Sequence, residues 1–180
     1  NRTSAFKPKP SQQGFTLIEL IVVIVILGIL AVTAAPKFIS FTSDARVSAL
    51  SGLKGGIAGA MQVVYAKSAI DGKEGTESTT ASNVPIAYGY PKPTSAAMLL
   101  AASIASAVDG ASDFVYVETL FTGTGTSFVP GILHLYPSAL FTTTKDVSAV
   151  ETAACFVKYV GAANVDTPPI VTMITTGCDG

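Results

Sequence analysis

Tryptophan is absent from this sequence, histidine occurs once, and charged residues are scarce. Lysine, arginine, aspartate and glutamate make up 13% of the 180 residues, against about 25% in a typical soluble domain. A zinc site needs more ligands than two cysteines and His134 provide at this spacing. The sequence contains no G-x-S-x-G, H-E-x-x-H or P-loop motif. We therefore expect no catalytic residues, no metal and no cofactor, and the chain is not predicted to be an enzyme.

A strongly basic surface is also missing. The first 14 residues hold Arg2, Lys7 and Lys9 and no acidic residue, which leaves residues 15–180 with eight basic against 12 acidic residues, a formal net charge of −4. General nucleic-acid binding needs a basic face, so this mildly acidic body argues against it. Basic residues before an apolar span favour a cytoplasmic N-terminus, with the rest of the chain on the far side of the membrane.

The longest apolar run begins at Phe15 and extends to Ala35. The residues in it that are not plainly apolar are Thr16, Glu19, Gly28 and Thr33. As a helix the run is about 30 Å long, the thickness of one bilayer core. A cleaved secretory signal, with Val32-Thr33-Ala34 as its cleavage site, is the first alternative. Because the apolar region of a signal peptide spans only about 7–15 residues, the longer run favours a membrane-spanning helix.

Glu19 is the one carboxylate in this run. A charged residue inside a transmembrane helix costs about 2.5–3.5 kcal/mol on insertion scales. The residues alone leave two interpretations open. Either Glu19 meets a positively charged partner in the apolar environment, or it lies close enough to the helix start to reach the lipid headgroups. Its position five residues after Gly14 favours the second interpretation.

Gly14-Phe15-Thr16-Leu17-Ile18-Glu19, with a basic segment before it, an apolar span after it and Pro36 beyond, resembles the N-terminal motif of type IVa pilins. The string GFTLIELIVVIVILGILAVTAAPKF is most similar to the mannose-sensitive haemagglutinin (MSHA) group of major pilins. The resemblance covers Gln13 to about Arg46. It implies that a prepilin peptidase cuts between Gly14 and Phe15 and methylates the new amine of Phe15. It also implies that Glu19 neutralises this amine on a neighbouring subunit.

The chain is predicted to have three segments: a prepilin leader over residues 1–14, a hydrophobic transmembrane or filament-core helix over 15–36, and a globular head over 37–180 that includes the amphipathic half of the same helix. Gly28 and Pro36 are predicted kink positions. The helix continues to about Ile70 through apolar residues spaced three and four apart: Val47, Leu50, Leu53, Ile57, Met61 and Val64. Close packing is expected on four glycines that disfavour helix by about 1 kcal/mol each: Gly52, Gly55, Gly56 and Gly59.

The remaining residues predict a loop, a helix and a sheet. Residues 71–93 have the composition of a long loop. A second helix is expected over Thr94–Val108, capped by Thr94 or Ser95, and its predicted common face holds Leu100, Ile104 and Val108. Strands are predicted over residues 113–119, 127–136, 155–160 and 170–175. Pro130-Gly131 marks the second strand as bulged, at an edge, or split in two.

Connections too short for crossover helices make this sheet antiparallel. The predicted fold class is therefore α+β: a long N-terminal helical spine, hydrophobic and then amphipathic, packed on a C-terminal antiparallel sheet of about four strands. Cys155 and Cys178 are predicted to form a disulfide, because a hairpin about residues 164–168 brings them together and an export compartment is oxidising. Two free buried thiols are the alternative.

His134 is expected to be a surface or hydrogen-bonded residue and not a catalytic one. Asp109 and Asp113 can contribute to a calcium site, as happens in pseudopilins, although their spacing matches no EF-hand loop.

The resemblance implies a structural protein, the major subunit of a type IV pilus, which polymerises into a helical surface filament for adhesion. The implied partners are further copies of the chain, the prepilin peptidase and the pilus assembly machinery, with surface glycans or phage as candidate ligands. The expected location is the bacterial inner membrane before assembly and the extracellular filament afterwards. A minor pilin or a type II secretion pseudopilin is the alternative in the same family. A single-pass membrane-anchored enzyme or receptor is the alternative from a different class.

Overall fold

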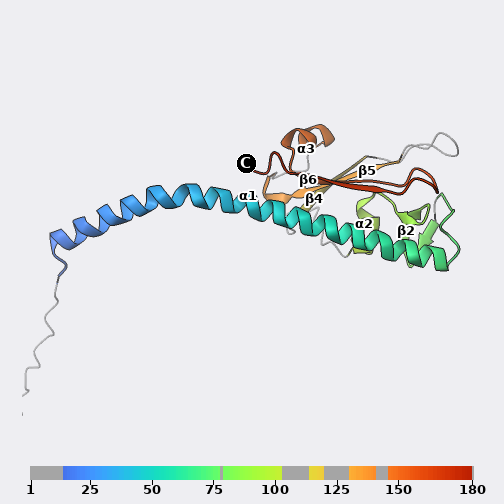
Figure 1. Cartoon of the computed structure of the whole chain (residues 1–180), viewed down its shortest axis with the longest axis horizontal. Helices are drawn as coiled ribbons and strands as arrows, with labels where there is room; N and C mark the ends of the chain where they lie inside the picture. The colour runs from blue at the N-terminus through green and yellow to red at the C-terminus, as the bar shows by residue number, and fades with distance from the viewer. Residues whose placement is uncertain (1–13, 78, 103–113, 120–129, 141–145, 180) are drawn as a thin grey trace, which may run out of the picture. The chain divides into compact units, whose positions relative to one another are not determined.

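The computed structural model describes residues 14–77, 79–102, 114–119, 130–140 and 146–179, without the side chains of residues 35–40. Two compact units divide the chain, Asn1–Ser40 and Phe41–Gly180. Helix α1 (Leu17–Ile70) contributes to both of them, as the colour scale of Figure 1 shows. The described part of the first unit is therefore mainly one end of α1, and the second unit contains the other end together with both sheets.

In the first unit, α1 is apolar and uncovered. Leu17–Ala34 has a mean hydropathy of 3.0, and 0% of it is buried within the chain. By length and composition this segment suits a membrane crossing. The predicted apolar helix is confirmed, and it begins two residues after Phe15. The helix assignment continues through Gly28 and Pro36 without a break, and the kink expected at these residues stays a prediction.

In the second unit, one stripe of α1 contributes to the main core. Leu50, Leu53, Ile57 and Met61 are buried in one cluster with residues of the large sheet. The amphipathic pattern predicted to end near Ile70 is therefore confirmed. Ser68, where the apolar pattern fades, is also buried, and its hydroxyl donates to the carbonyl oxygens of Tyr65 and Gly89.

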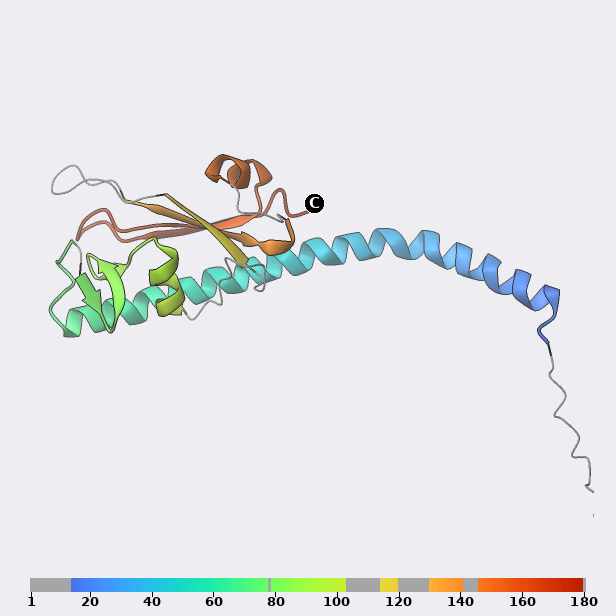
Figure 2. The same cartoon turned by 180° about the vertical axis from the view of Figure 1, so that it is seen from behind.

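Four antiparallel strands form the large sheet, in the order β4 (Phe114–Thr119), β5 (Ile132–Pro137), β6 (Phe156–Val160) and β7 (Ile170–Ile174). The sheet lies along the second half of α1 (Figures 1 and 2). Alternate residues of its inner face, such as Leu133, Leu135, Val157 and Tyr159, join the α1 stripe in the core. This arrangement confirms the predicted α+β fold and the antiparallel four-stranded sheet.

The edge interpretation of Pro130-Gly131 is wrong, whereas the bulged and split interpretations stay predictions. β5 begins at Ile132, directly after this pair, and it lies between β4 and β6 in the interior of the sheet. The N-terminal part of the predicted strand, residues 127–129, lies outside the described residues. Proline is tolerated here because it precedes the strand and removes no hydrogen bond from the ladder.

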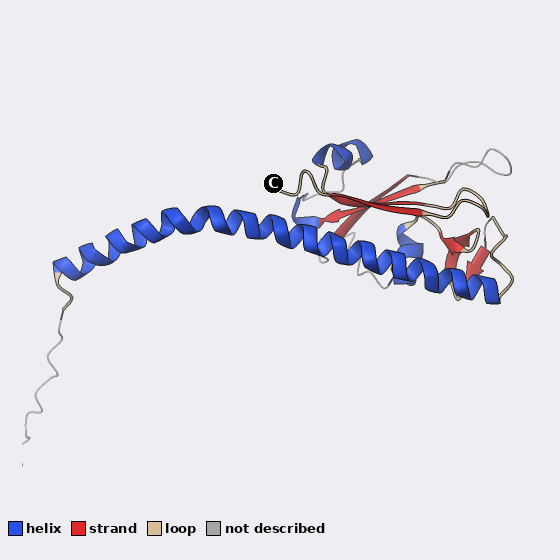
Figure 3. Ribbon diagram, viewed as in Figure 1, coloured by secondary structure: helices blue, strands red, loops and turns tan. Residues whose placement is uncertain are grey.

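The prediction of a featureless loop over residues 71–93 is also wrong. Figure 3 shows a small second sheet near the end of α1, formed by β1 (Thr79–Ala81), β2 (Val84–Ala87) and β3 (Tyr90–Pro91). Two-residue turns join the strands, and all four turn residues have positive φ: Ser82, Asn83, Tyr88 and Gly89. Such turns match the twist of antiparallel strands. Ile86 of β2 is fully buried, so this sheet belongs to the core.

Helix α2 (Ser95–Ala102) follows the small sheet. Thr94 caps it as predicted, since its hydroxyl oxygen accepts from the Ala97 amide at 3.2 Å. The carboxylate of Glu118 in β4 accepts from the Ser95 amide at 2.7 Å and ties α2 to the large sheet. In its described part α2 buries Ala97 and Met98 while Leu100 is 52% exposed, and the common face predicted for Leu100, Ile104 and Val108 stays a prediction. Residues 103–108 of the predicted helix, Ile104 and Val108 among them, lie outside the described residues.

Two short helices after β5 were not predicted at all: η2 (Ser138–Leu140) and α3 (Val147–Ala153). Asp146 caps α3, and its side chain accepts from the Ala149 amide at 2.8 Å. In Figure 1, α3 lies on the face of the large sheet opposite α1. There Val150 packs with Tyr136 and Phe156 in a cluster of its own, so both faces of the sheet are covered in part.

Candidate functional site

The start of α1 contains a reciprocal pair of hydrogen-bonding residues. The Thr16 amide and the Thr16 hydroxyl both donate to Oε2 of Glu19, each at 2.8 Å. The Glu19 amide donates in return to the Thr16 hydroxyl oxygen at 3.4 Å. Because α1 begins at Leu17, Thr16 is the N-cap residue and Glu19 is the third residue of the helix. The arrangement is a capping box, which satisfies amides that have no partner inside a helix.

Apolar side chains lie beside this carboxylate on the exposed surface of α1. Glu19 lies in an open groove with Phe15, Ile18, Val22 and Val23. Phe15 is 92% exposed. In the described part of the chain no cation pairs with Glu19. The sequence contains no lysine, arginine or histidine between Gly14 and Ala34. A positive partner for Glu19 must therefore come from outside these residues, which keeps the first of the two interpretations open.

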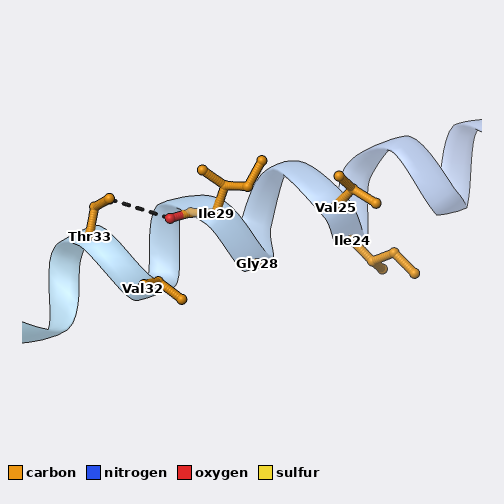
Figure 4. A pocket seen from close by; sticks show the side chains of 6 residues that line it. All are labelled: Ile24, Val25, Gly28, Ile29, Val32 and Thr33. Carbon is orange, nitrogen blue, oxygen red and sulfur yellow. Dashed lines mark hydrogen bonds between the residues drawn. The ribbon is translucent and has the colours of Figure 1, made fainter.

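Gly14 is not required by the packing of this chain. A Cβ atom added at Gly14 would meet no atom within 4 Å, and the same is true at Gly28. Figure 4 shows that Gly28 forms the floor of a shallow groove on α1. The groove is lined by Ile24, Val25, Gly28, Ile29, Val32 and Thr33. The Thr33 hydroxyl turns back to the helix and donates to the Leu30 carbonyl at 3.0 Å, so the groove is apolar.

The predicted disulfide between Cys155 and Cys178 is present, with Cα atoms 4.9 Å apart. It joins the start of β6 to the C-terminal segment. Two hydrogen bonds hold that same segment to α1: Arg46 Nη1 donates to the Cys178 carbonyl at 2.8 Å, and the Ser43 hydroxyl donates to the Asp179 carboxylate. The disulfide therefore holds the sheet and the chain end together against α1.

His134 is fully buried in β5, so the surface interpretation is wrong and the hydrogen-bonded one is confirmed. Its Nε2 lies 3.3 Å from Oε1 of Glu151 in α3, and the same oxygen accepts from Lys158 at 3.1 Å. Burial lowers the pKa of the imidazole, although the hydrogen bond to Glu151 opposes this effect. Among the described residues, no serine, cysteine or threonine is hydrogen-bonded to the ring. His134, Glu151 and Lys158 together link α3 to the sheet.

Metal ligands do not cluster in the described part of the chain, where no group of three or more His, Cys, Asp or Glu residues is found. The calcium candidates Asp109 and Asp113 lie outside the described residues.

The glycines of α1 do not have the close neighbours that were expected. A Cβ added at any of them would meet no atom of this chain within 4 Å: Gly52, Gly55, Gly56 and Gly59. They lie on an exposed side of α1, away from the buried stripe. No described residue of this chain packs on these glycines, so the expected close packing stays a prediction.

The start of the chain matches a known family model. The chain carries a prokaryotic N-terminal methylation motif. The match covers residues 9–35, which include Gly14, Phe15, Thr16 and Glu19. No curated protein and no solved structure matches the chain. The motif supports a type IV pilin-like or pseudopilin-like protein, a structural class, and an apolar helix that is anchored in a membrane before assembly.

Sequence reasoning missed the hydrogen bonds between Thr16 and Glu19, although the sequence contains their signal. Thr-x-x-Glu directly before an apolar helical run is the pattern of a capping box. The box does not supply a positive charge, so it explains how Glu19 is satisfied locally and not why a carboxylate is there.

Proposed function

We propose that this chain is the major structural subunit of a type IV pilus. It is cleaved between Gly14 and Phe15, methylated on the new amine of Phe15, and polymerised into a helical surface filament for adhesion. The observation that carries the proposal is the methylation motif placed on an uncovered apolar helix with a carboxylate at its start. The proposed segments are the leader 1–14, the membrane or filament-core helix 15–36 and the head 37–180.

An uncovered helix of this kind needs an apolar environment. The side chains of Leu17–Ala34 are exposed in the single chain, and exposed apolar surface of this extent is unfavourable in water. The inner membrane provides the environment before assembly, with the N-terminus in the cytoplasm as the basic residues before the helix favour. In the filament, the same helices of neighbouring copies replace the lipid.

Glu19 fixes the axial position of one apolar helix relative to its neighbour in the filament. Contacts among Leu, Ile and Val side chains change little when one helix slides along another, because they are not directional. A carboxylate in an apolar environment costs several kcal/mol without a positive partner. The group with the right charge at the right depth is the amine of Phe15 on a neighbouring copy, which exists only after cleavage and stays charged when methylated. The pair selects one axial position and makes assembly depend on processing.

Two alternatives share some of these features. A minor pilin or a type II secretion pseudopilin has the same motif and helix, and abundance in sheared surface filaments separates it from a major subunit. A single-pass membrane-anchored enzyme or receptor would keep its leader and stay in the membrane. The same measurement excludes it when the chain is found in filaments with Phe15 at its N-terminus.

The test is the assembly of Glu19→Val in cells that also express the wild-type chain. The variant should be processed and held in the membrane, and its share of sheared filaments should fall far below its share of the processed membrane pool. Glu19→Asp, shorter by one methylene, should be intermediate. Glu74→Val is the matched control, since it removes an exposed carboxylate from a turn of the second unit. Incorporation of Glu19→Val at its share of the membrane pool would overturn the proposed pairing.

Surface ligands of the filament belong to the proposal as well. Residues 71–93 and the edge of the large sheet should face outward, because the apolar helix must be buried among its neighbours. Glycans or phage, where they bind, should contact this region. Substitutions in residues 71–93 that block attachment and leave filament number unchanged would support the assignment, and a complete scan without such a phenotype, alongside a positive control, would contradict it.

A further inference from the structure

Thr16 is the residue that holds the carboxylate of Glu19 in the single chain. Thr16 directs two donors, its amide and its hydroxyl, at one carboxylate oxygen of Glu19, and both distances are 2.8 Å. The other oxygen, Oε1, accepts no hydrogen bond from any described residue. The carboxylate thus has one occupied oxygen and one free oxygen in the single chain.

No other described residue fixes the orientation of Glu19. The remaining residues of its groove are Phe15, Ile18, Val22 and Val23, whose side chains have no donor. None of this segment is buried within the chain, so tertiary packing does not select a rotamer either. The orientation of the carboxylate therefore depends on the Thr16 contacts.

We propose that Thr16 is a positioning residue for assembly, and this rests on the proposed pairing of Glu19 with the amine of Phe15 on another copy. Thr16 holds Oε2 and leaves Oε1 free to accept from the incoming amine. A carboxylate accepts about four hydrogen bonds, so the two bonds from Thr16 do not compete with the amine. A methylated amine keeps its charge and still has N–H groups to donate.

The capping box also persists through processing. Cleavage between Gly14 and Phe15 changes the amine of Phe15 but leaves the Thr16 amide and hydroxyl intact. Before assembly, the two donors of Thr16 lower the cost of an unpaired carboxylate at the edge of the apolar layer. During assembly, an oriented carboxylate loses less side-chain entropy when it forms the pair. Both effects favour an assembly-competent subunit over one with a freely rotating carboxylate.

The experiment measures incorporation of Thr16→Val and Thr16→Ser beside the wild-type chain. Valine keeps the branched shape of threonine and removes the hydroxyl, whereas serine keeps the hydroxyl. For each variant, mass spectrometry of the N-terminal peptide gives its share of sheared filaments divided by its share of the processed membrane pool. Division by the processed pool removes any effect of Thr16 on the peptidase. Thr33→Val makes the same atomic change in the same helix, at a hydroxyl that donates to backbone carbonyls, and it measures the general effect of losing a hydroxyl.

The expected ratio for Thr16→Val is lower than that for wild type by about five-fold, the size of losing one capping side chain. Thr16→Ser should stay within about two-fold of wild type, and Thr33→Val should have a smaller effect than Thr16→Val. In a Glu19→Val background, Thr16→Val should cause no further loss, because there is no carboxylate left to position. A residue that only stabilises the helix start would lower the ratio equally in both backgrounds.

The outcomes separate this inference from the function on which it rests. If Glu19→Val itself is incorporated normally, the proposed pairing fails. If Glu19→Val is excluded while Thr16→Val matches wild type, the pairing stands and the positioning role is wrong. The positioning role is equally wrong if serine fails to restore incorporation or if the effect of Thr16→Val persists without the carboxylate.

Discussion

Replacing Cys155 and Cys178 together with alanine should lower the free energy of unfolding of the second unit by about 3.5 kcal/mol. The two residues are 23 positions apart, and the chain-entropy relation for a loop of that size gives about 3.5 kcal/mol at 25 °C. Both side chains are buried, at 1% and 0% exposure, so their lost core contacts add to this figure. Alanine at both sites leaves neither a free thiol nor a buried hydroxyl that would need a hydrogen-bond partner.

A second prediction concerns the hydrogen bond from Arg46 to the Cys178 carbonyl, whose contribution to the free energy of unfolding should depend on the disulfide. A hydrogen bond to a charged group contributes about 1.5–3 kcal/mol when it is well formed, and this one is 2.8 Å long and partly buried. Because the disulfide holds the same carbonyl in place, the two contributions should not add. Arg46→Ala should cost about 1.5 kcal/mol with the disulfide present and less than half of that without it.

Guanidinium unfolding of the full chain in detergent micelles measures these values. All six tyrosines lie between Tyr65 and Tyr159 and no tryptophan is present, so intrinsic fluorescence reports the second unit alone. The midpoint and the slope of each transition give the four free energies of the cycle. A loss below about 1 kcal/mol for the double alanine variant would refute the loop-closure estimate. Full additivity with Arg46→Ala would refute the coupling, and complete thiol labelling of denatured wild type would refute the bond.

Two further predictions concern processing and pH. Gly14→Val should leave the full-length chain in the membrane, because the fold itself places nothing within 4 Å of Gly14 and the demand for glycine comes from the peptidase; surface filaments of this variant that begin at Phe15 would contradict the assignment. The second unit should lose stability as the pH falls below about 6.5, since burial lowers the pKa of His134 and the unfolded chain takes up a proton that the folded chain does not. Above about pH 6.5 the neutral, buried His134 makes its full contribution to the free energy of unfolding. This contribution decreases as the pH falls from there to the lower pKa that His134 has in the folded chain. His134→Gln should flatten this part of the urea-midpoint profile, and an unchanged profile would show that another group titrates there.

The elements that could be predicted from the sequence have strong periodicity or strong propensity. α1 was predicted because its apolar residues recur at spacings of three and four from Val47 to Val64 and follow an unbroken apolar run. The strands of the large sheet were predicted from their Val, Ile, Phe and Tyr content. The antiparallel orientation of those strands was predicted from the short connections, whereas their order in the sheet was not.

The elements that were missed are short and lie among turn-forming residues. The small sheet has strands of three, four and two residues, too few for alternation to be recognised. Its turns at Ser82-Asn83 and Tyr88-Gly89 adopt positive φ without the Asn-Gly or Asp-Gly pair that marks such turns in sequence. α3 has seven residues, and Asp146 before it was the one available signal. In the candidate site, the Thr-x-x-Glu pattern of a capping box was present in the sequence. Only a positively charged partner or the lipid headgroups were considered for Glu19 from the sequence, and so the bonds to Thr16 were missed.

Replacing glycine with alanine should lower the stability of this chain at one position and raise it at another. At Gly177, an added Cβ would clash with the carbonyl oxygen of Ala153, so Gly177→Ala should displace the turn next to Cys178 and destabilise the second unit by more than 1 kcal/mol, roughly the lower end of overpacking costs. At Gly56 in the middle of α1, an added Cβ meets nothing. Gly56→Ala should therefore stabilise the helix by about 1 kcal/mol.

The four glycines in this exposed stretch of α1 together lower the stability of the helix by on the order of 4 kcal/mol relative to alanine. No described residue of the same chain makes a contact there that would compensate for this cost. Under the proposed function the compensation is found in the filament, where a surface without side chains lets a neighbouring backbone approach closely. Gly56→Ala should then raise the unfolding midpoint of the purified chain and yet lower its share of filaments when it is expressed beside wild type. A variant that is more stable and equally incorporated would show that these glycines serve neither the fold nor the contacts between subunits.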